Sequence, residues 1–132
     1  MAEPGDGRAG RELWKLNVTR ERFADVCVVA ANGRVGSDAA SDLAMVCVHA
    51  LQEREPRLLI DLNGVDYMSS PGLAALEEIA SMTSKAGGSL VLCHLSEPVR
   101  LALDLGGLTG AFVIEPTRDA ALARLRNRTQ DP

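Results

Sequence analysis

Residues 58–73 read LLIDLNGVDYMSSPGL, and their pattern predicts a strand followed by a helix. Residues 58–62 are apolar apart from one acid, which is typical of a central strand covered on both faces. From residue 71 to residue 86 the apolar side chains recur at helical spacing. Proline disfavours helical dihedrals in the preceding residue and suits the first helical position. The sequence therefore predicts Ser70 as the N-cap and Pro71 as the first residue of this helix.

The Ser70 hydroxyl at a helix mouth has two interpretations. Serine caps are common because the hydroxyl accepts from backbone N–H groups of the first turn. A phosphate on the same oxygen would meet those donors and the positive end of the helix dipole, so the position also suits a phosphoserine. Asp61 and Asp66 flank the turn before it and could either position the serine loop or merely cap turns. The local motif leaves both questions open.

Apolar periodicity on either side of this stretch predicts alternating strands and helices. We expect strands at residues 14–18, 26–30, 58–62, 90–93 and 111–114, and helices at residues 38–53 (capped by Ser37 or Asp38), 71–86, a short one after Ser96 and a last one after Thr117. The polar residues 20–22 are expected to separate the first two strands, which pair as a hairpin. Crossover connections then place helices against a mainly parallel sheet. The predicted fold is α/β, a mixed, mainly parallel β-sheet with an antiparallel edge strand and about four helices, in the order ββαβαβαβα.

Composition limits the function classes. With 132 residues, 46% of them hydrophobic and 24% charged, the chain is long enough for one globular domain, expected at residues 13–126 between flexible tails at 1–12 and 127–132. A net charge of −4 argues against nucleic acid as a partner. The opening residues have no apolar stretch, so we expect neither an export signal nor membrane insertion, and a cytoplasmic protein.

Cysteines and histidines give no sign of a metal or cofactor site. Cys27, Cys47 and Cys93 each lie in an apolar run and form no close pair, which fits free thiols in a reducing compartment. His49 falls on the polar face of its helix. His94 follows Cys93 and would point to the opposite side if both lay in a strand. We therefore expect no metal site and no cofactor.

Several segments together resemble the STAS family, named for sulphate transporters and anti-sigma-factor antagonists. The resemblance spans residues 13–126 and is of the anti-sigma-factor antagonist type. It is carried by residues 58–68 as the strand and its approach, by residues 69–73 (SSPGL) as the signature, and by residues 87–92, 99–108 and 117–122 as the later pattern. Ser69 stands where many members carry Asp, and Pro71 replaces a small residue.

This resemblance implies a regulator that works by binding. In family members that regulate sigma factors, the serine that aligns with Ser70 is phosphorylated by a serine kinase that also acts as the anti-sigma factor, and a serine phosphatase reverses the modification. The unmodified protein, a monomer or weak dimer, would bind the anti-sigma factor, and the phosphorylated protein would be released. We expect the partner surface to comprise the helix mouth with nearby apolar atoms and the loop at residues 33–37: Met68, Ser69, Ser70, Pro71, Gly72 and Leu73, with Gly33, Arg34, Gly36 and Ser37.

Two other functions compete with this one. The domain could be a constitutive scaffold of a signalling or transport complex, with Ser70 only a cap. It could also be a serine hydrolase, which needs a Gly-x-Ser-x-Gly elbow and a histidine base. Position 68 is Met rather than Gly, and neither of the two histidines lies at a loop that would return to Ser70. We therefore expect no enzyme.

Overall fold

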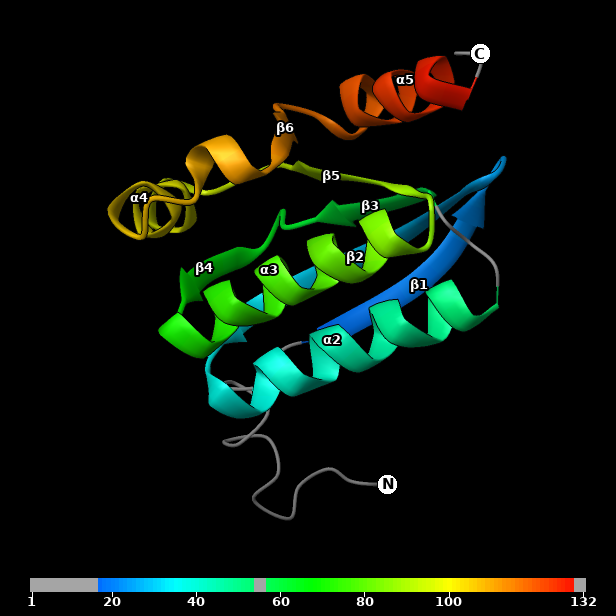
Figure 1. Cartoon of the computed structure of the whole chain (residues 1–132). Helices are drawn as coiled ribbons and strands as arrows, with labels where there is room; N and C mark the ends of the chain where they lie inside the picture. The colour runs from blue at the N-terminus through cyan, green and yellow to red at the C-terminus, as the bar shows by residue number, and fades with distance from the viewer. Residues whose placement is uncertain (1–16, 54–56, 130–132) are drawn as a thin grey trace, which may run out of the picture.

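The computed structural model describes residues 17–53 and 57–129, which form a sheet with helices on both sides (Figure 1). The elements in chain order are β1 (Asn17–Phe23), β2 (Val26–Val35), α2 (Ser37–Gln52), β3 (Arg57–Asp61), β4 (Val65–Met68), α3 (Ser70–Lys85), β5 (Ser89–Cys93), α4 (Glu97–Leu105), η1 (Thr109–Ala111), β6 (Val113–Glu115) and α5 (Arg118–Thr129). The predicted tail at residues 1–12 and the first residues of the predicted edge strand, Trp14 and Leu16, lie outside the described residues.

The sheet is mixed and mainly parallel. Its strand order is β1-β2-β3-β5-β6, with β4 paired to β2 off this path. β1 and β2 form the predicted antiparallel hairpin, and the other neighbours are parallel. This confirms the predicted fold class. The structure adds the strand β4, which the order ββαβαβαβα does not contain.

Helices α2 and α3 lie side by side on one face of the sheet, and α5 lies on the other face (Figure 1). Successive side chains of a strand point to opposite faces of the sheet, so β2 contributes to the hydrophobic core on both faces. Cys27 and Val29 belong to the core cluster beneath α2 and α3. Val26 and Val28 belong to a second cluster with Leu125 of α5. β2 is therefore buried on both faces of the sheet.

β2 changes its partner strand near its end. It pairs with β3 up to Ala30 and with β4 from Gly33, with a register irregularity between Gly33 and Arg34. The Gly33 N–H donates to the Gly64 carbonyl over 2.9 Å, and a Cβ on Gly64 would lie 2.8 Å from the Asn32 Cβ. The prediction of a loop at residues 33–37 is therefore wrong. Gly33 allows the irregularity with a φ of 124° instead of ending the strand.

Three element boundaries also differ from the prediction. β1 runs through the charged residues 20–22 to Phe23, and the turn lies at Ala24, whose φ is 59°, and Asp25. Charged side chains fit there because β1 is an edge strand and largely exposed. α5 continues to Thr129, so residues 127–129 are helical rather than part of a tail. β6 begins at Val113, because residues 109–111 form the short helix η1.

Candidate functional site

The helix that carries the serine pair begins one residue earlier than predicted. Ser69 is the N-cap of α3, in an extended conformation, and its hydroxyl accepts a hydrogen bond from the Gly72 N–H over 3.1 Å. Ser70 is the first helical residue and Pro71 the second, so the prediction of Ser70 as N-cap is wrong. Proline fits either position, because no N–H in the first turn has an acceptor within the helix. Ser70 is exposed, and the cap hydrogen bond is made by its neighbour.

The first turn of α3 packs directly on the sheet through Gly72. A Cβ at this buried glycine would lie 2.6 Å from the Met68 sulfur and 2.8 Å from Cγ1 of Val35. Met68, which we expected to contact a partner, is only 6% exposed and supports the turn from beneath. Leu73 is half-buried. This packing holds Ser70 at a defined place on the surface.

A second strand-to-helix junction lies beside the first. Gly36 is the N-cap of α2 without a side-chain hydrogen bond, so the predicted cap by Ser37 or Asp38 is wrong. Ser37 is the first residue of α2 and is exposed. The Ser69 N–H donates to the Val35 carbonyl over 2.9 Å, which joins the two junctions. The structure thus brings the two predicted segments of the site together.

A shallow groove separates the amino-terminal halves of α2 and α3. We call it the α2–α3 groove; its volume is about 250 Å³, and it is lined by Ser37, Ala40, Ser41, Ala44, Pro71, Ala74, Ala75 and Glu78. The small side chains let the helices approach closely, and the groove begins next to Ser70. It offers a surface for contact rather than a cavity for a small molecule.

An aromatic and cationic pair lies at the same end of the sheet. Arg34 and Tyr67 are register partners on β2 and β4, and the guanidinium lies 4.4 Å from the ring centroid. Tyr67 is 40% exposed. Arg34 was among the residues expected at the partner surface. Tyr67 was not, because β4 was not predicted and the directions of its side chains were unknown.

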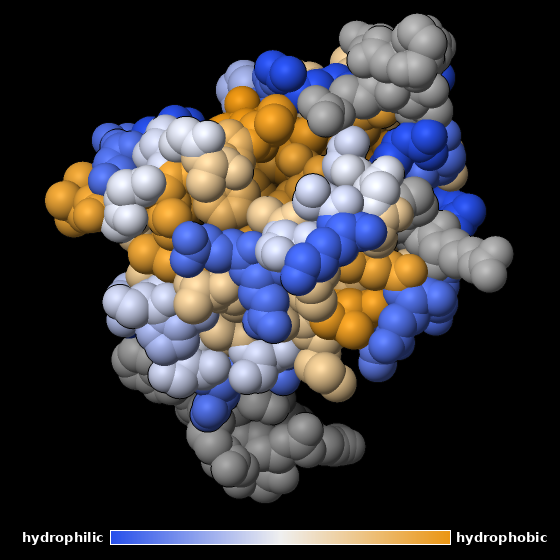
Figure 2. Space-filling view, in the orientation of Figure 1, coloured by the Kyte–Doolittle hydropathy of each residue, from blue (hydrophilic) through white to orange (hydrophobic). Residues whose placement is uncertain are grey.

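Two leucines of α4 extend this surface. Leu101 is 55% exposed and Leu105 is 79% exposed, and Figure 2 shows hydrophobic atoms protruding over α4 at the left. The helix packs against β4, and a Cβ on Gly106 would lie 3.4 Å from Leu73 of α3. The carboxyl-terminal end of α4 therefore lies near Leu73 in the first turn of α3. Both leucines lie on the face of α4 opposite the buried Val99 and Leu103. Apolar residues on that face were a sequence sign of a contact surface, and we did not include them in the prediction.

A buried polar cluster lies at the carboxyl ends of β3 and β5. Asp61 is 4% exposed and accepts from the Asn63 N–H at 3.0 Å and from Arg118 Nε at 3.0 Å and Nη2 at 2.9 Å. Its Oδ1 also lies 2.9 Å from Nδ1 of His94. Burial raises the pKa of Asp61, but these hydrogen bonds outweigh burial and the pKa lies below its ordinary value. Asp61 had two open interpretations, and the structure shows the turn cap, in which its carboxylate accepts from the Asn63 N–H.

Cys93 completes this cluster. Its sulfur lies 4.0 Å from Nδ1 of His94, so the two side chains lie on the same side. β5 ends at Cys93, so the condition under which we expected opposite sides, that both residues lie in a strand, is not met. His94 has a φ of 57°, which ends the strand alternation and turns the imidazole to the side of the thiol. Burial, and next the charge of Asp61, raise the pKa of the Cys93 thiol to about 12. The thiol and the carboxylate face the same ring nitrogen, whereas a nucleophilic triad uses both nitrogens.

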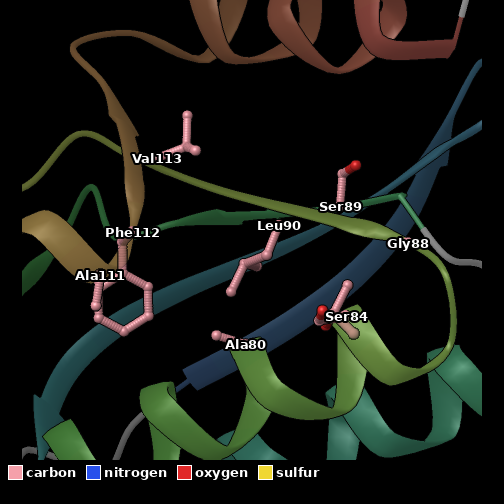
Figure 3. A pocket seen from close by; sticks show the side chains of 9 residues that line it. Ala80, Ser84, Gly88, Ser89, Leu90, Ala111, Phe112 and Val113 are labelled. Atoms are coloured by element: carbon pink, nitrogen blue, oxygen red, sulfur yellow. The ribbon is translucent and has the colours of Figure 1, made fainter. Parts of the chain in front are cut away.

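A second concave surface lies between α3 and the start of β5 and β6. It has a volume of about 250 Å³ and is lined by Ala80, Thr83, Ser84, Gly88, Ser89, Leu90, Ala111, Phe112 and Val113. Figure 3 shows Leu90 and Phe112 pointing toward Ala80 of α3. On this side α3 packs against β5, whereas α4 packs against β4. Its lining offers hydroxyl groups but no acid, base or thiol.

Among the described residues, no helix combines the length and the apolar character needed to cross a membrane.

Comparisons with known proteins agree with this architecture. The family model of the STAS domain matches residues 17–121. A protein of Bordetella bronchiseptica named "Putative anti-sigma factor antagonist BtrV" is 28% identical over 111 residues, covering 84% of this chain and 96% of the relative. The crystal structure of an anti-sigma factor antagonist from Mycobacterium paratuberculosis superposes with a TM-score of 0.77 at 27% identity, covering 85% of this chain and 95% of that one.

A more distant structure has the same fold. The phosphorylated form of the Bacillus cell fate determinant SpoIIAA matches with a TM-score of 0.66 at 16% identity, covering 83% of this chain and 100% of that one. The family model alone spans most of the sheet and its helices, from the start of β1 into α5. The chain therefore belongs to the STAS domain family.

Proposed function

We propose that this protein is an anti-sigma-factor antagonist, a binding protein that is switched by phosphorylation of Ser70. The observation that carries the proposal is the exposed hydroxyl of Ser70 in the first turn of α3, next to a cap hydrogen bond made by Ser69. The names of the Bordetella relative and of the mycobacterial structure support the same class of function. The protein would act by binding rather than by catalysis.

The docking surface would surround Ser70. It would include the α2–α3 groove with Ser37 and Pro71, the stacked pair of Arg34 and Tyr67, and the exposed leucines of α4. Aromatic and arginine side chains contribute strongly to protein interfaces, and the leucines supply apolar area. All of these groups belong to one chain, so a single copy of the protein would be sufficient to form the docking surface. Of the residues expected from sequence, Met68 and Gly72 would act from beneath the surface.

Phosphorylation would change the charge of this surface without altering the fold. A phosphate on Ser70 carries about −1.5 to −2 charges and would lie at the positive end of the α3 dipole. The cap hydrogen bond from Gly72 to Ser69 would be kept, because it does not involve Ser70. In the complex the same phosphate would be buried against the partner. A hundredfold loss of affinity requires about 2.7 kcal/mol, which an unpaired interfacial charge supplies.

The test is phosphorylation by candidate anti-sigma-factor serine kinases with ATP. The tryptic peptide that spans residues 58–85 contains Ser69, Ser70, Ser81 and Ser84, and fragment masses distinguish these positions. We expect phosphate on Ser70, loss of labelling in Ser70→Ala, and retained labelling in Ser69→Ala, the matched control. A serine phosphatase of the same pathway would then remove the label.

Binding to the same kinases separates the switch from a constitutive scaffold. We expect Ser70→Glu to bind at least about a hundredfold more weakly than Ser70→Ala. Equal affinity of these two variants, together with an unlabelled wild-type protein, would instead identify a constitutive scaffold.

A further inference from the structure

We propose that Asp61, Cys93 and His94 form a binding site for a divalent transition metal ion, with Zn²⁺ as the best fit. One carboxylate oxygen, one sulfur and one imidazole nitrogen all lie within 4.8 Å of one another. Sulfur, nitrogen and oxygen donors of this kind are the ligands that Zn²⁺ takes in proteins. The three side chains supply three ligands, and water would supply the fourth.

The backbone at His94 places its ring in the cluster. A residue after Cys93 in a regular strand would point to the other face of the sheet. His94 instead has a φ of 57°, in the left-handed region that residues with a side chain rarely adopt. Backbone of this kind is concentrated at functional sites. Here it brings the imidazole within 4.0 Å of the Cys93 sulfur and 2.9 Å of the Asp61 carboxylate.

The surroundings of Asp61 are suited to a ligating carboxylate. Ligating carboxylates are themselves usually held by hydrogen bonds from a second layer of residues. Oδ2 of Asp61 is held by Arg118, and Oδ1 accepts from the Asn63 N–H. Metal binding would keep these bonds and replace only the contact between Asp61 and His94. Nδ1 of His94 would then bind the ion.

Binding of a divalent cation would balance the charges of the cluster. Arg118 is paired on its other side with Glu21, over 3.2 Å. With a neutral thiol and a neutral imidazole, Asp61 and Glu21 exceed Arg118 by one negative charge. Binding of Zn²⁺ would displace the proton of Cys93 to solvent as the metal–sulfur bond forms, so one proton is released for each ion bound. The ion, the thiolate, the two carboxylates and the guanidinium then sum to neutrality.

Access to the site is through His94. The sulfur of Cys93 is buried, whereas the His94 side chain is 32% exposed. An ion could reach the donors along the ring without unfolding of the sheet. The site lies at the ends of β3 and β5, away from Ser70, so metal binding and phosphorylation can be tested separately.

The experiment is titration of chelator-treated protein with Co²⁺, followed by competition with Zn²⁺. We expect the visible spectrum of tetrahedral Co²⁺ with a thiolate charge-transfer band, displacement by Zn²⁺, and release of one proton per ion. Cys93→Ala should abolish the charge-transfer band. His94→Asn, which tolerates the left-handed backbone, should weaken binding at least about tenfold.

Matched controls test another buried thiol and the other histidine. Cys47→Ala removes a buried thiol elsewhere in the core, and His49→Gln removes an exposed imidazole. Both variants should bind Co²⁺ like the wild type. Circular dichroism verifies that each variant is folded. The proposal is overturned if the folded wild type gives no charge-transfer band, or if the band persists in Cys93→Ala.

Discussion

Replacing Gly72 with alanine tests whether the Ser70 junction is held by close packing of α3 on the sheet. The added Cβ would lie 2.6 Å from the Met68 sulfur and 2.8 Å from Cγ1 of Val35, and both distances are shorter than real Cβ contacts. Overpacking of this kind costs about 1–3 kcal/mol. Alanine recovers up to about 1 kcal/mol over glycine within a helix. We expect Gly72→Ala to lower the free energy of unfolding by about 1–2 kcal/mol.

Urea denaturation followed by circular dichroism measures this change. The melting temperature should also fall, by about 4 °C for each kcal/mol in a domain of this size. Gly110→Ala is the control, because a Cβ at Gly110 would meet nothing within 4 Å. We expect Gly110→Ala to leave stability unchanged or to raise it slightly. If Gly72→Ala is as stable as the wild type, the junction is not held by close packing of α3 at Gly72.

Three further predictions concern the cap and the polar cluster. Ser69→Ala should lower the free energy of unfolding by about 1 kcal/mol in urea denaturation, because α3 loses its cap hydrogen bond. Despite the opposing effect of burial, hydrogen bonds from His94 and Arg118 hold the pKa of Asp61 below its ordinary value of 3.8. Asp61 therefore stabilises the metal-free fold above that pH, and Asp61→Asn should remove the part of the acid destabilisation that develops as the pH falls below it. The Cys93 thiol, with a pKa raised to about 12, should stay unreactive toward a disulfide reagent at pH 8 until the protein unfolds, and rapid labelling of native protein would contradict this.

The alternation of strands and helices could be predicted because it depends on local periodicity. Long apolar runs gave β2, β3 and β5, and helical spacing gave α2 and α3. β4 could not be found in this way. It has four residues, of which only the first and the last are buried, so it shows no alternation. Its strand character comes from pairing with the end of β2, a contact between distant segments.

The site was predicted in outline, and its details depend on geometry that the sequence does not specify. Two adjacent serines precede a proline that fits the first or the second helical position, so the sequence did not distinguish the cap from its neighbour. Asp61 and Arg118 are 57 positions apart, and their contact depends on where β3 ends and α5 begins. The left-handed backbone of His94 could not be predicted either, because the alternation of side chains along a strand assumes extended backbone throughout.

The unpredicted strand explains why the proposed switch at the serine junction would need no refolding. β4 places Ser69 beside the end of β2. There the Ser69 N–H donates to the Val35 carbonyl, and the Ser69 hydroxyl caps α3. Ser69 thus carries both structural bonds of the junction, and Gly72 packs the first turn against the strands below. Ser70 projects from a turn that is already fixed by its neighbours. Under the proposed function, a charge added at Ser70 would therefore act on the protein bound against that turn, and not on the turn itself.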